Sequence, residues 1–303
     1  MRLVTYRVNI DAEARLGAIV GDLLIDMAKL GAAAGVPLPP TMLEFIDLGP
    51  QAVTLANELI DLANGFFPLS AAIPVGNAKL LAPIPRPRKN IFGIGLNYTE
   101  HVAESARALE TAIELPQQPV VFSKPPTSVI AWNEPIRHNA AVTQQMDWET
   151  ELAVIIGSTA CNVAEADALD YVFGYTVIND VSARDCRRSG QWIVSKGQDS
   201  FAPMGPCIVT RDEIADPHNL NLWTRVNGVE KQNSNTRFML FNINQLIADI
   251  SSVMTLEPGD IIATGTPAGV GAGRDPQEFM WPGDVVECHV EGIGALRNPI
   301  VAV

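Results

Sequence analysis

Three acidic residues with strand-like spacing are the first candidates for chemistry in this sequence. Asp147, Glu149 and Glu151 occupy alternate positions just before an aliphatic run that ends at Gly157. Side chains alternate between the two faces of a strand, so all three carboxylates should project from one side. Carboxylates gathered at the mouth of a buried strand repel one another and lose hydration, and a bound divalent cation would relieve both costs. The spacing predicts a metal site; ordinary acids on a solvated strand edge are the alternative.

A fourth acid follows a second strand-like run. Residues 174–179 are mostly apolar or aromatic, and Asp180 comes directly after them. The two runs are close enough in sequence to form neighbouring strands. Carboxylate oxygens are hard ligands, so the set favours magnesium, manganese or calcium over zinc or copper.

His101 and Glu104 form a second candidate group. A strand over about 90–95 and a turn through Asn97 precede a helix that should begin at Thr99, a suitable N-cap residue. Residues three apart share a helix face, so the Glu104 carboxylate could orient the imidazole for proton transfer. The alternative is a solvated pair with no catalytic part. The polar, alanine-rich stretch 105–118 is interpreted as a mobile lid.

Composition excludes several classes of function. The chain of 303 residues has a formal net charge of −13, which argues against nucleic acid and anionic membrane surfaces as partners. Hydrophobic residues make up 47 %, enough for a sizeable core. The N-terminus lacks the apolar region of a signal peptide, and no apolar run approaches the length of a membrane span. We therefore expect a soluble, cytoplasmic protein that acts on a small molecule.

The chain divides near a proline-rich stretch. Pro83, Pro85 and Pro87 mark an extended boundary between an accessory domain, residues 1–85, and a catalytic domain, residues 86–303. In the first part we predict strands and two short helices; in the second we predict a hairpin and a further helix, and interpret one Gly/Pro-rich run as an ordered loop. In order, these elements are strands 2–8, 15–20 and 23–26, helices within 41–64, the loop 196–206, the hairpin around Asn227-Gly228 and the helix 242–254.

Seven segments, in the same order, resemble the fumarylacetoacetate hydrolase superfamily. They are GLNYTEHVAE, VVFSKP, DWETELAVIIG, GYTVINDVSARD, KGQDSFAPMGP, LEPGDIIATGTPAGVG and WPGDVVECHVEGIGAL, and they span about residues 90–297. The likeness is to acylpyruvase and 2-hydroxyhepta-2,4-diene-1,7-dioate isomerase-like members. It implies a β-rich α+β fold in which a mixed β-sheet roll surrounds the metal site, together with a small N-terminal accessory domain.

The resemblance also implies roles for individual residues. Magnesium or manganese, possibly calcium in a crystal, would be held by Glu149, Glu151 and Asp180, while the position of Asp147 is not usually a ligand. The family's His-x-x-Glu dyad matches His101 and Glu104, and its lysine matches Lys196. We predict that the substrate is contacted by residues of three further motifs: Lys124, Arg184, Arg187, Thr264, Gly265 and Thr266.

Together these groups favour metal-dependent cleavage of a carbon–carbon bond. His101 would activate water, Lys196 would stabilise the developing oxyanion, and the cation would polarise a 1,3-dicarbonyl substrate of the acylpyruvate or 2,4-dioxo acid type. The alternatives are an oxaloacetate decarboxylase, an isomerase or hydratase of aromatic-degradation intermediates, and a metal-binding protein without turnover. Acylpyruvase-like members commonly have glutamine where this chain has Arg187. This difference leaves the identity of the oxo acid substrate open. The resemblance also predicts a homodimer.

Overall fold

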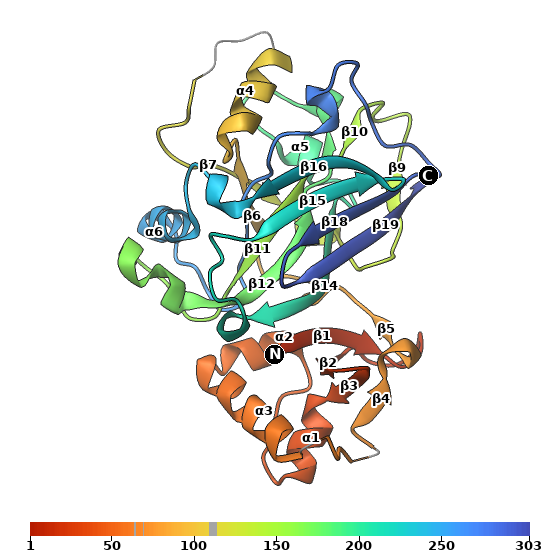
Figure 1. Ribbon diagram of the computed structural model, residues 1–303, viewed down its shortest axis with the longest axis vertical. Helices are drawn as coiled ribbons and strands as arrows, with labels where there is room; N and C mark the ends of the chain where they lie inside the picture. The colour runs from red at the N-terminus through yellow and green to blue at the C-terminus, as the bar shows by residue number, and fades with distance from the viewer. Residues whose placement is uncertain (64, 69, 109–113) are drawn as a thin grey trace.

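A computed structural model describes the chain from residue 1 to 303 except residues 64, 69 and 109–113 (Figure 1). Its described helices are α1 (Met27–Ala33), α2 (Met42–Asp47), α3 (Pro50–Ala63), α4 (Thr99–Ala108), α5 (Ile193–Lys196) and α6 (Ile243–Val253). No helix in this part of the chain has both the length and the apolar character needed to span a bilayer.

Most strands belong to two sheets. The larger sheet contains β1 (Arg2–Arg7), β2 (Arg15–Val20), β3 (Leu23–Asp26), β4 (Ala72–Pro74), β5 (Lys79–Leu80), β6 (Ile91–Gly95), β7 (Val120–Lys124), β8 (Val129–Ile130), β11 (Thr150–Ile156), β12 (Val172–Asn179), β14 (Ala202–Thr210) and β17 (Ile261–Ala263). The second sheet contains β9 (Ile136–His138), β15 (Asn221–Val226), β16 (Val229–Asn235), β18 (Val285–Val290) and β19 (Gly294–Ala302). A small ladder joins β10 (Met146–Asp147) to β13 (Ser182–Ala183).

The larger sheet runs in the order β4-β3-β2-β1-β14-β12-β11-β17-β6-β7, with β5 paired to β1 and β8 to β14. Both parallel and antiparallel pairs occur, for example β17 with β6 and β11 with β12. The strand-rich α+β architecture predicted from the sequence is therefore confirmed. The division at residue 85 stays a prediction, and the sheet runs across it because Arg2 and Leu3 pair with Val209 and Ile208.

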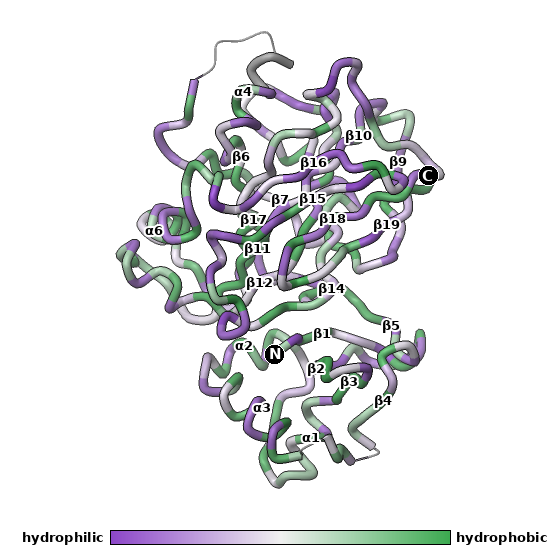
Figure 2. Tube along the Cα trace, in the orientation of Figure 1, coloured by the Kyte–Doolittle hydropathy of each residue, from purple (hydrophilic) through white to green (hydrophobic). Residues whose placement is uncertain are grey.

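Strand β11 is buried on both faces, which explains its aliphatic run (Figure 2). Leu152 and Val154 pack in a core shared with strands β9, β15, β18 and β19 of the second sheet. Ala153 and Ile155 point to the other side, into a core that includes Phe45 and the N-terminal helices. Strict alternation therefore connects one strand to two cores, and its start is held rigidly between them.

Most predicted elements are confirmed, and two differ. Helix α1 was not predicted; the Asp26 carboxylate accepts the Lys29 amide hydrogen at its N-terminus, so a strand-end acid also starts a helix. The run 196–206 was interpreted as a loop, but it contains the end of α5 and the start of β14. A register shift opposite Gly205 explains how a strand tolerates this Gly/Pro-rich sequence.

Replacement of Phe45 by alanine is expected to reduce the free energy of unfolding by about 3 to 5 kcal/mol. The Phe45 ring is fully buried and meets Phe173 of β12 edge-on, with ring centroids 6.3 Å apart. Urea denaturation followed by circular dichroism measures the change. Leu48→Ala is the control, since Leu48 is 52 % exposed and its loss should change stability by less than about 0.5 kcal/mol. Equal losses in the two variants would contradict this account of the core.

Candidate active site and metal centre

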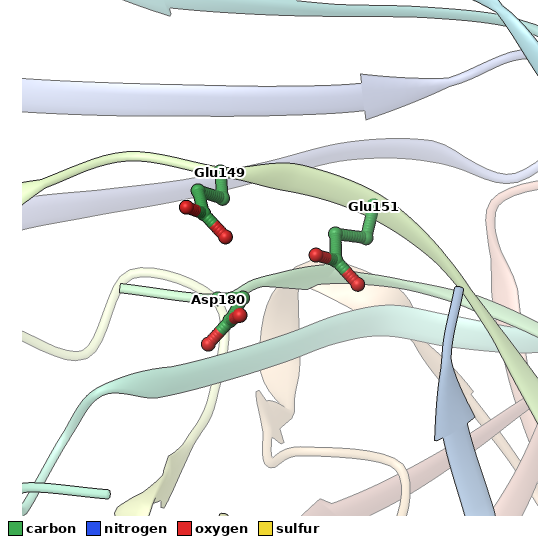
Figure 3. A group of neighbouring side chains, drawn as sticks. All are labelled: Glu149, Glu151 and Asp180. Carbon is green, nitrogen blue, oxygen red and sulfur yellow. The ribbon is translucent and has the colours of Figure 1, made fainter. Parts of the chain in front are cut away.

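The structure brings Glu149, Glu151 and Asp180 together at one end of β11 and β12 (Figure 3). Antiparallel pairing sets Thr150 opposite Asn179, so the start of one strand meets the end of the other. One carboxylate oxygen from each acid lies within 4.8 Å of the others, and all three side chains are buried. We call this group the carboxylate triad.

The triad fits a hard divalent cation. Burial raises the pKa of Glu151, and the negative charges of Asp180 and Glu149 raise it further. A cation bound among the three would remove that repulsion, and three oxygen donors supply about half of an octahedral shell. A solvated strand edge, the alternative considered from the sequence, is inconsistent with the burial of all three acids.

Lys196 contacts two of the three acids of the triad. Its Nζ donates hydrogen bonds to Glu149 Oε2 at 2.7 Å, Asp180 Oδ2 at 2.5 Å and Ser182 Oγ at 3.0 Å. Burial alone would lower the pKa of Lys196, but the charges of Asp180 and Glu149 outweigh it and raise the pKa. The lysine is therefore held in its ammonium form against two of the three acids.

Lys124 is fully buried and contacts the Asp180 carboxylate of the triad. Its fully buried Nζ donates to Asp180 Oδ1 at 2.5 Å, to the Val181 carbonyl at 3.3 Å and to the Lys196 carbonyl. Burial lowers the pKa of Lys124, and Asp180 opposes that shift. All three ammonium hydrogens thus have protein acceptors, so in this geometry the predicted substrate contact has no donor left over.

Asp147 shares the acidic stretch but lies outside the triad. Its Oδ1 accepts the amide hydrogens of Trp148 at 2.8 Å and Gly271 at 2.6 Å. Its Oδ2 accepts from the Ala272 amide at 3.0 Å and from Arg184 Nε at 2.8 Å. Both oxygens are therefore used by protein donors, which agrees with the family pattern for this position.

Arg184 connects Asp147 to the triad. Besides its bond to Asp147, it forms an ion pair with Glu149, whose Oε1 lies 2.6 Å from Nη2. Burial by itself would raise the pKa of Glu149. The positive charges of Lys196 and Arg184 lower it by more than burial raises it, so the pKa falls well below the usual range. Arg184 thus keeps a buried glutamate ionised.

The His101–Glu104 pair lies on the first turns of α4. His101 Nδ1 and Glu104 Oε2 are 3.2 Å apart, and both side chains are buried, which rules out the solvated pair considered from the sequence. The Gly269 amide donates to both Glu104 oxygens, at 3.0 and 3.2 Å. Gly271 and Ala272, further along the same segment, donate to Asp147, so the dyad is connected to the acidic stretch that carries Glu149 and Glu151. The interpreted lid, 105–118, includes 109–113, which lie outside the described residues.

The segment 264–266 is tied to β11. The hydroxyls of Thr264 and Thr266 donate to carbonyl oxygens of Leu152 and Thr150, at 2.8 and 2.9 Å. The Gly265 amide donates to Glu151 Oε2 at 2.8 Å. The substrate contact predicted for these residues stays a prediction; in the structure the carboxylate that the Gly265 amide holds is one of the triad.

Sequence reasoning missed two amide side chains that hold the start of β11. Gln232 of β16 accepts the Thr150 amide hydrogen at 3.0 Å and donates to Thr266 Oγ1 at 2.8 Å. Asn179 Oδ1 accepts the Glu149 amide hydrogen at 2.9 Å. Asn179 could have been noticed in the sequence because it directly precedes Asp180. Gln232 lies in a hairpin strand, and no motif or spacing there indicates contact with the site.

Arg187 lies apart from the other cations and packs on an aromatic ring. Its guanidinium carbon is 4.7 Å from the centre of the Trp192 ring. Within the described residues it forms no salt bridge. The residue is exposed as a whole, although desolvation of its guanidinium and the charge of Arg184 lower its pKa.

Comparison with known proteins identifies relatives over almost the whole chain. A family profile described as "Fumarylacetoacetate (FAA) hydrolase C-terminal" matches residues 90–301. A mitochondrial oxaloacetate tautomerase from Xenopus laevis is 42 % identical over 306 residues, which cover 99 % of this chain and 90 % of that protein. The oxaloacetate tautomerase YisK from Bacillus subtilis is 40 % identical over 270 residues, 87 % of each chain.

Among solved structures, a maleylpyruvate hydrolase from Sphingobium sp. SYK-6 in complex with manganese(II) and pyruvate has a TM-score of 0.78. It is 31 % identical, and the match covers 100 % of this chain and 99 % of that one.

These relatives overturn one prediction. Hydrolytic cleavage of an acylpyruvate was expected, but the curated relatives from frog and Bacillus are oxaloacetate tautomerases, so the expectation of a C–C hydrolase is wrong. The oxaloacetate alternative fits them better. The physical reason is that a cation site, a lysine and a His–Glu dyad stabilise an enolate whichever bond changes, so these residue types do not distinguish the reactions.

Replacement of Glu151 by glutamine should weaken divalent metal binding by on the order of 100-fold, because the triad loses one of its three charges. Calorimetric titration with Mn²⁺ as the probe measures the affinity. Glu58→Gln is the control, since Glu58 is exposed on α3 and should leave the affinity unchanged. An unchanged affinity in Glu151→Gln would show that the triad does not hold the metal.

Proposed function

Since the chain belongs to the fumarylacetoacetate hydrolase family, we propose that it is an oxaloacetate tautomerase, which interconverts the keto and enol forms of this dicarboxylate. The observation that carries the proposal is a buried carboxylate triad together with a buried His–Glu dyad, in a chain 40–42 % identical to oxaloacetate tautomerases. The reaction moves one proton between C3 and the oxygen on C2, so it needs a base at carbon and positive charge near that oxygen.

Glu149, Glu151 and Asp180 would hold magnesium or manganese. The Mn²⁺ complex of the related maleylpyruvate hydrolase supports this choice, as does the all-oxygen donor set. When bound, the cation would supply Lewis acidity toward the oxygen on C2.

His101 is the proposed base. Glu104 lies against Nδ1 and would keep that nitrogen protonated, which leaves Nε2 to remove a proton from C3. The imidazolium would then give this proton to the enolate oxygen on C2, which forms the enol and restores neutral His101, and the same two transfers would run backward in the reverse direction. Both side chains are buried, so water would compete little for the carbanion-like centre.

Lys196 would supply fixed positive charge near the oxygen on C2 and would act through its charge, since its three ammonium hydrogens already have protein acceptors. Its ammonium is held by Glu149, Asp180 and Ser182, so it would not need to reorganise as negative charge develops. Arg184 would act through Glu149, which it keeps ionised.

Arg187 is the proposed partner of the distal carboxylate of the substrate. Its guanidinium is stacked on Trp192 and has no acidic partner among the described residues, so it has donors free for a carboxylate. Thr264, Gly265 and Thr266 would act indirectly, by placing Glu151.

A homodimer remains part of the proposal. Val121, Ile193 and Met254 are 38–43 % exposed and border a cavity of about 530 Å³ beside β7, the last strand of the larger sheet. An apolar face next to a sheet edge is suited to a second copy of the chain.

Replacement of His101 by alanine should slow tautomerisation by about 10² or more, because proton transfer at C3 loses its base. The enzymatic rate is measured as the decrease of enol absorbance with time at saturating Mg²⁺, after the spontaneous rate has been subtracted. Glu104→Gln should show a smaller loss, and both variants should bind Mn²⁺ like the wild type. His218→Ala, outside the site, is the control. Near wild-type rates in His101→Ala would remove the dyad from the mechanism, and enzyme-dependent formation of pyruvate would show a decarboxylase.

Substitution of Arg187 by glutamine should raise KM for oxaloacetate by roughly 10- to 100-fold, with a smaller effect on kcat, because one charge-assisted contact to the distal carboxylate is lost. Arg188→Gln is the matched control, since Arg188 is the neighbouring residue, is exposed like Arg187, and does not stack on Trp192. An unchanged KM in Arg187→Gln would assign the distal carboxylate to another group.

A further inference from the structure

The loop from Gly269 to Gly273, here the 269–273 loop, lies between the acidic stretch and α4. On the strand side, Asp147 accepts the amide hydrogens of Gly271 and Ala272, at 2.6 and 3.0 Å. Trp148 Nε1 donates to the Gly269 carbonyl at 3.1 Å. Two consecutive residues just before Glu149 therefore hold this loop by three hydrogen bonds.

The same loop supports the dyad from the other side. The Gly269 amide donates to both oxygens of Glu104. Gly273 packs so closely that a Cβ atom there would overlap the Glu104 side chain. Gly269 has a φ of +103°, and a Cβ atom on it would overlap the Lys231 carbonyl. The loop is thus a close-fitting seat for the carboxylate that orients His101.

Asp147 is suited to be the fixed point of this arrangement. It has no exposed surface, and its charge is balanced by Arg184 Nε at 2.8 Å. It comes from the segment that carries Glu149 and Glu151, so any group it holds is placed relative to the triad. A loop held only by solvent-exposed contacts would be placed less rigidly relative to the triad.

We propose that Asp147 is a positioning residue that, through the 269–273 loop, fixes Glu104 and therefore His101 relative to the carboxylate triad. The proposal rests on the proposed function only for the catalytic part of His101. The contacts themselves are independent of which reaction is catalysed.

The first test is hydrogen exchange of the α4 backbone amides in the Mg²⁺-loaded full chain, with Asp147→Asn. The variant keeps the side-chain shape, but its amide can accept on one side only, so the loop loses part of its anchor. We expect α4 amides to exchange about 10-fold faster than in the wild type, and kcat to fall by a similar factor.

A second variant separates the loop contact from the charge. In Gly271→Ala the new methyl would lie 2.8 Å from Asp147 Oδ1 and overlap the Glu278 carbonyl, so the loop must shift while Asp147 keeps Arg184. Faster α4 exchange and lower kcat are expected again, with Mn²⁺ affinity as in the wild type. This variant also decides the question if Asp147→Asn does not fold.

The matched control is Asp260→Asn. Asp260 is also buried, and it also accepts a backbone amide hydrogen, from Glu257 at 2.8 Å, and pairs with a cation, Lys89 at 2.9 Å. Its loss should lower global stability without a selective effect on α4.

The outcomes are distinct. The proposal is wrong if α4 amides exchange at the wild-type rate in either folded variant, or if Asp260→Asn accelerates them equally. Absence of tautomerase activity in the wild type would overturn the proposed function, while the exchange rates would still test the positioning of the dyad. In the double variant Asp147→Asn, Gly273→Ala, the effects on exchange should be smaller than the product of the single effects, because both act through one loop.

Discussion

The arrangement of this protein depends on the balance of charge around three carboxylates that have lost their water. Glu149, Glu151 and Asp180 are buried at the junction of two antiparallel strands. Unpaired charges there would cost far more than a domain's net stability, so nearby groups must compensate. Lys196 and Arg184 neutralise Glu149 and Asp180, and the Gly265 amide holds Glu151, whose pKa is raised by burial and by the charges of Asp180 and Glu149.

Because those compensating groups come from distant parts of the chain, the fold and the site stabilise each other. The strand that carries two of the acids is packed between two cores, so its start cannot move to relieve repulsion. The energetic cost of the triad is offset by fixed ammonium, guanidinium and backbone dipoles. An enolate bound at the site would carry negative charge. The same ammonium, guanidinium and amide groups would be oriented toward that charge before the reaction begins.

The hydrolase prediction was wrong because the same central residues suit several reactions, and only the residues around them can differ between enzymes. As proposed, the triad, Lys196 and the dyad would stabilise an enolate formed by hydrolysis, decarboxylation or proton transfer alike. Discrimination between these reactions would then come from groups at the edge of the site. We propose Arg187 on Trp192 as one such group in this chain, and the placement of His101 by the 269–273 loop as another.

Local periodicity, spacing and ordered motifs are properties of the sequence, and from them the strand-rich α+β class, most element boundaries and the acids of the triad could be predicted. Long-range packing was needed to show that Asp147 holds a loop, that the Lys124 ammonium is fully used by Asp180 and nearby carbonyls, and that Gln232 supports the start of β11. These contacts join residues 56 to 124 positions apart. No local pattern encodes such partners, since which donors reach a buried acid depends on how the whole chain packs around it.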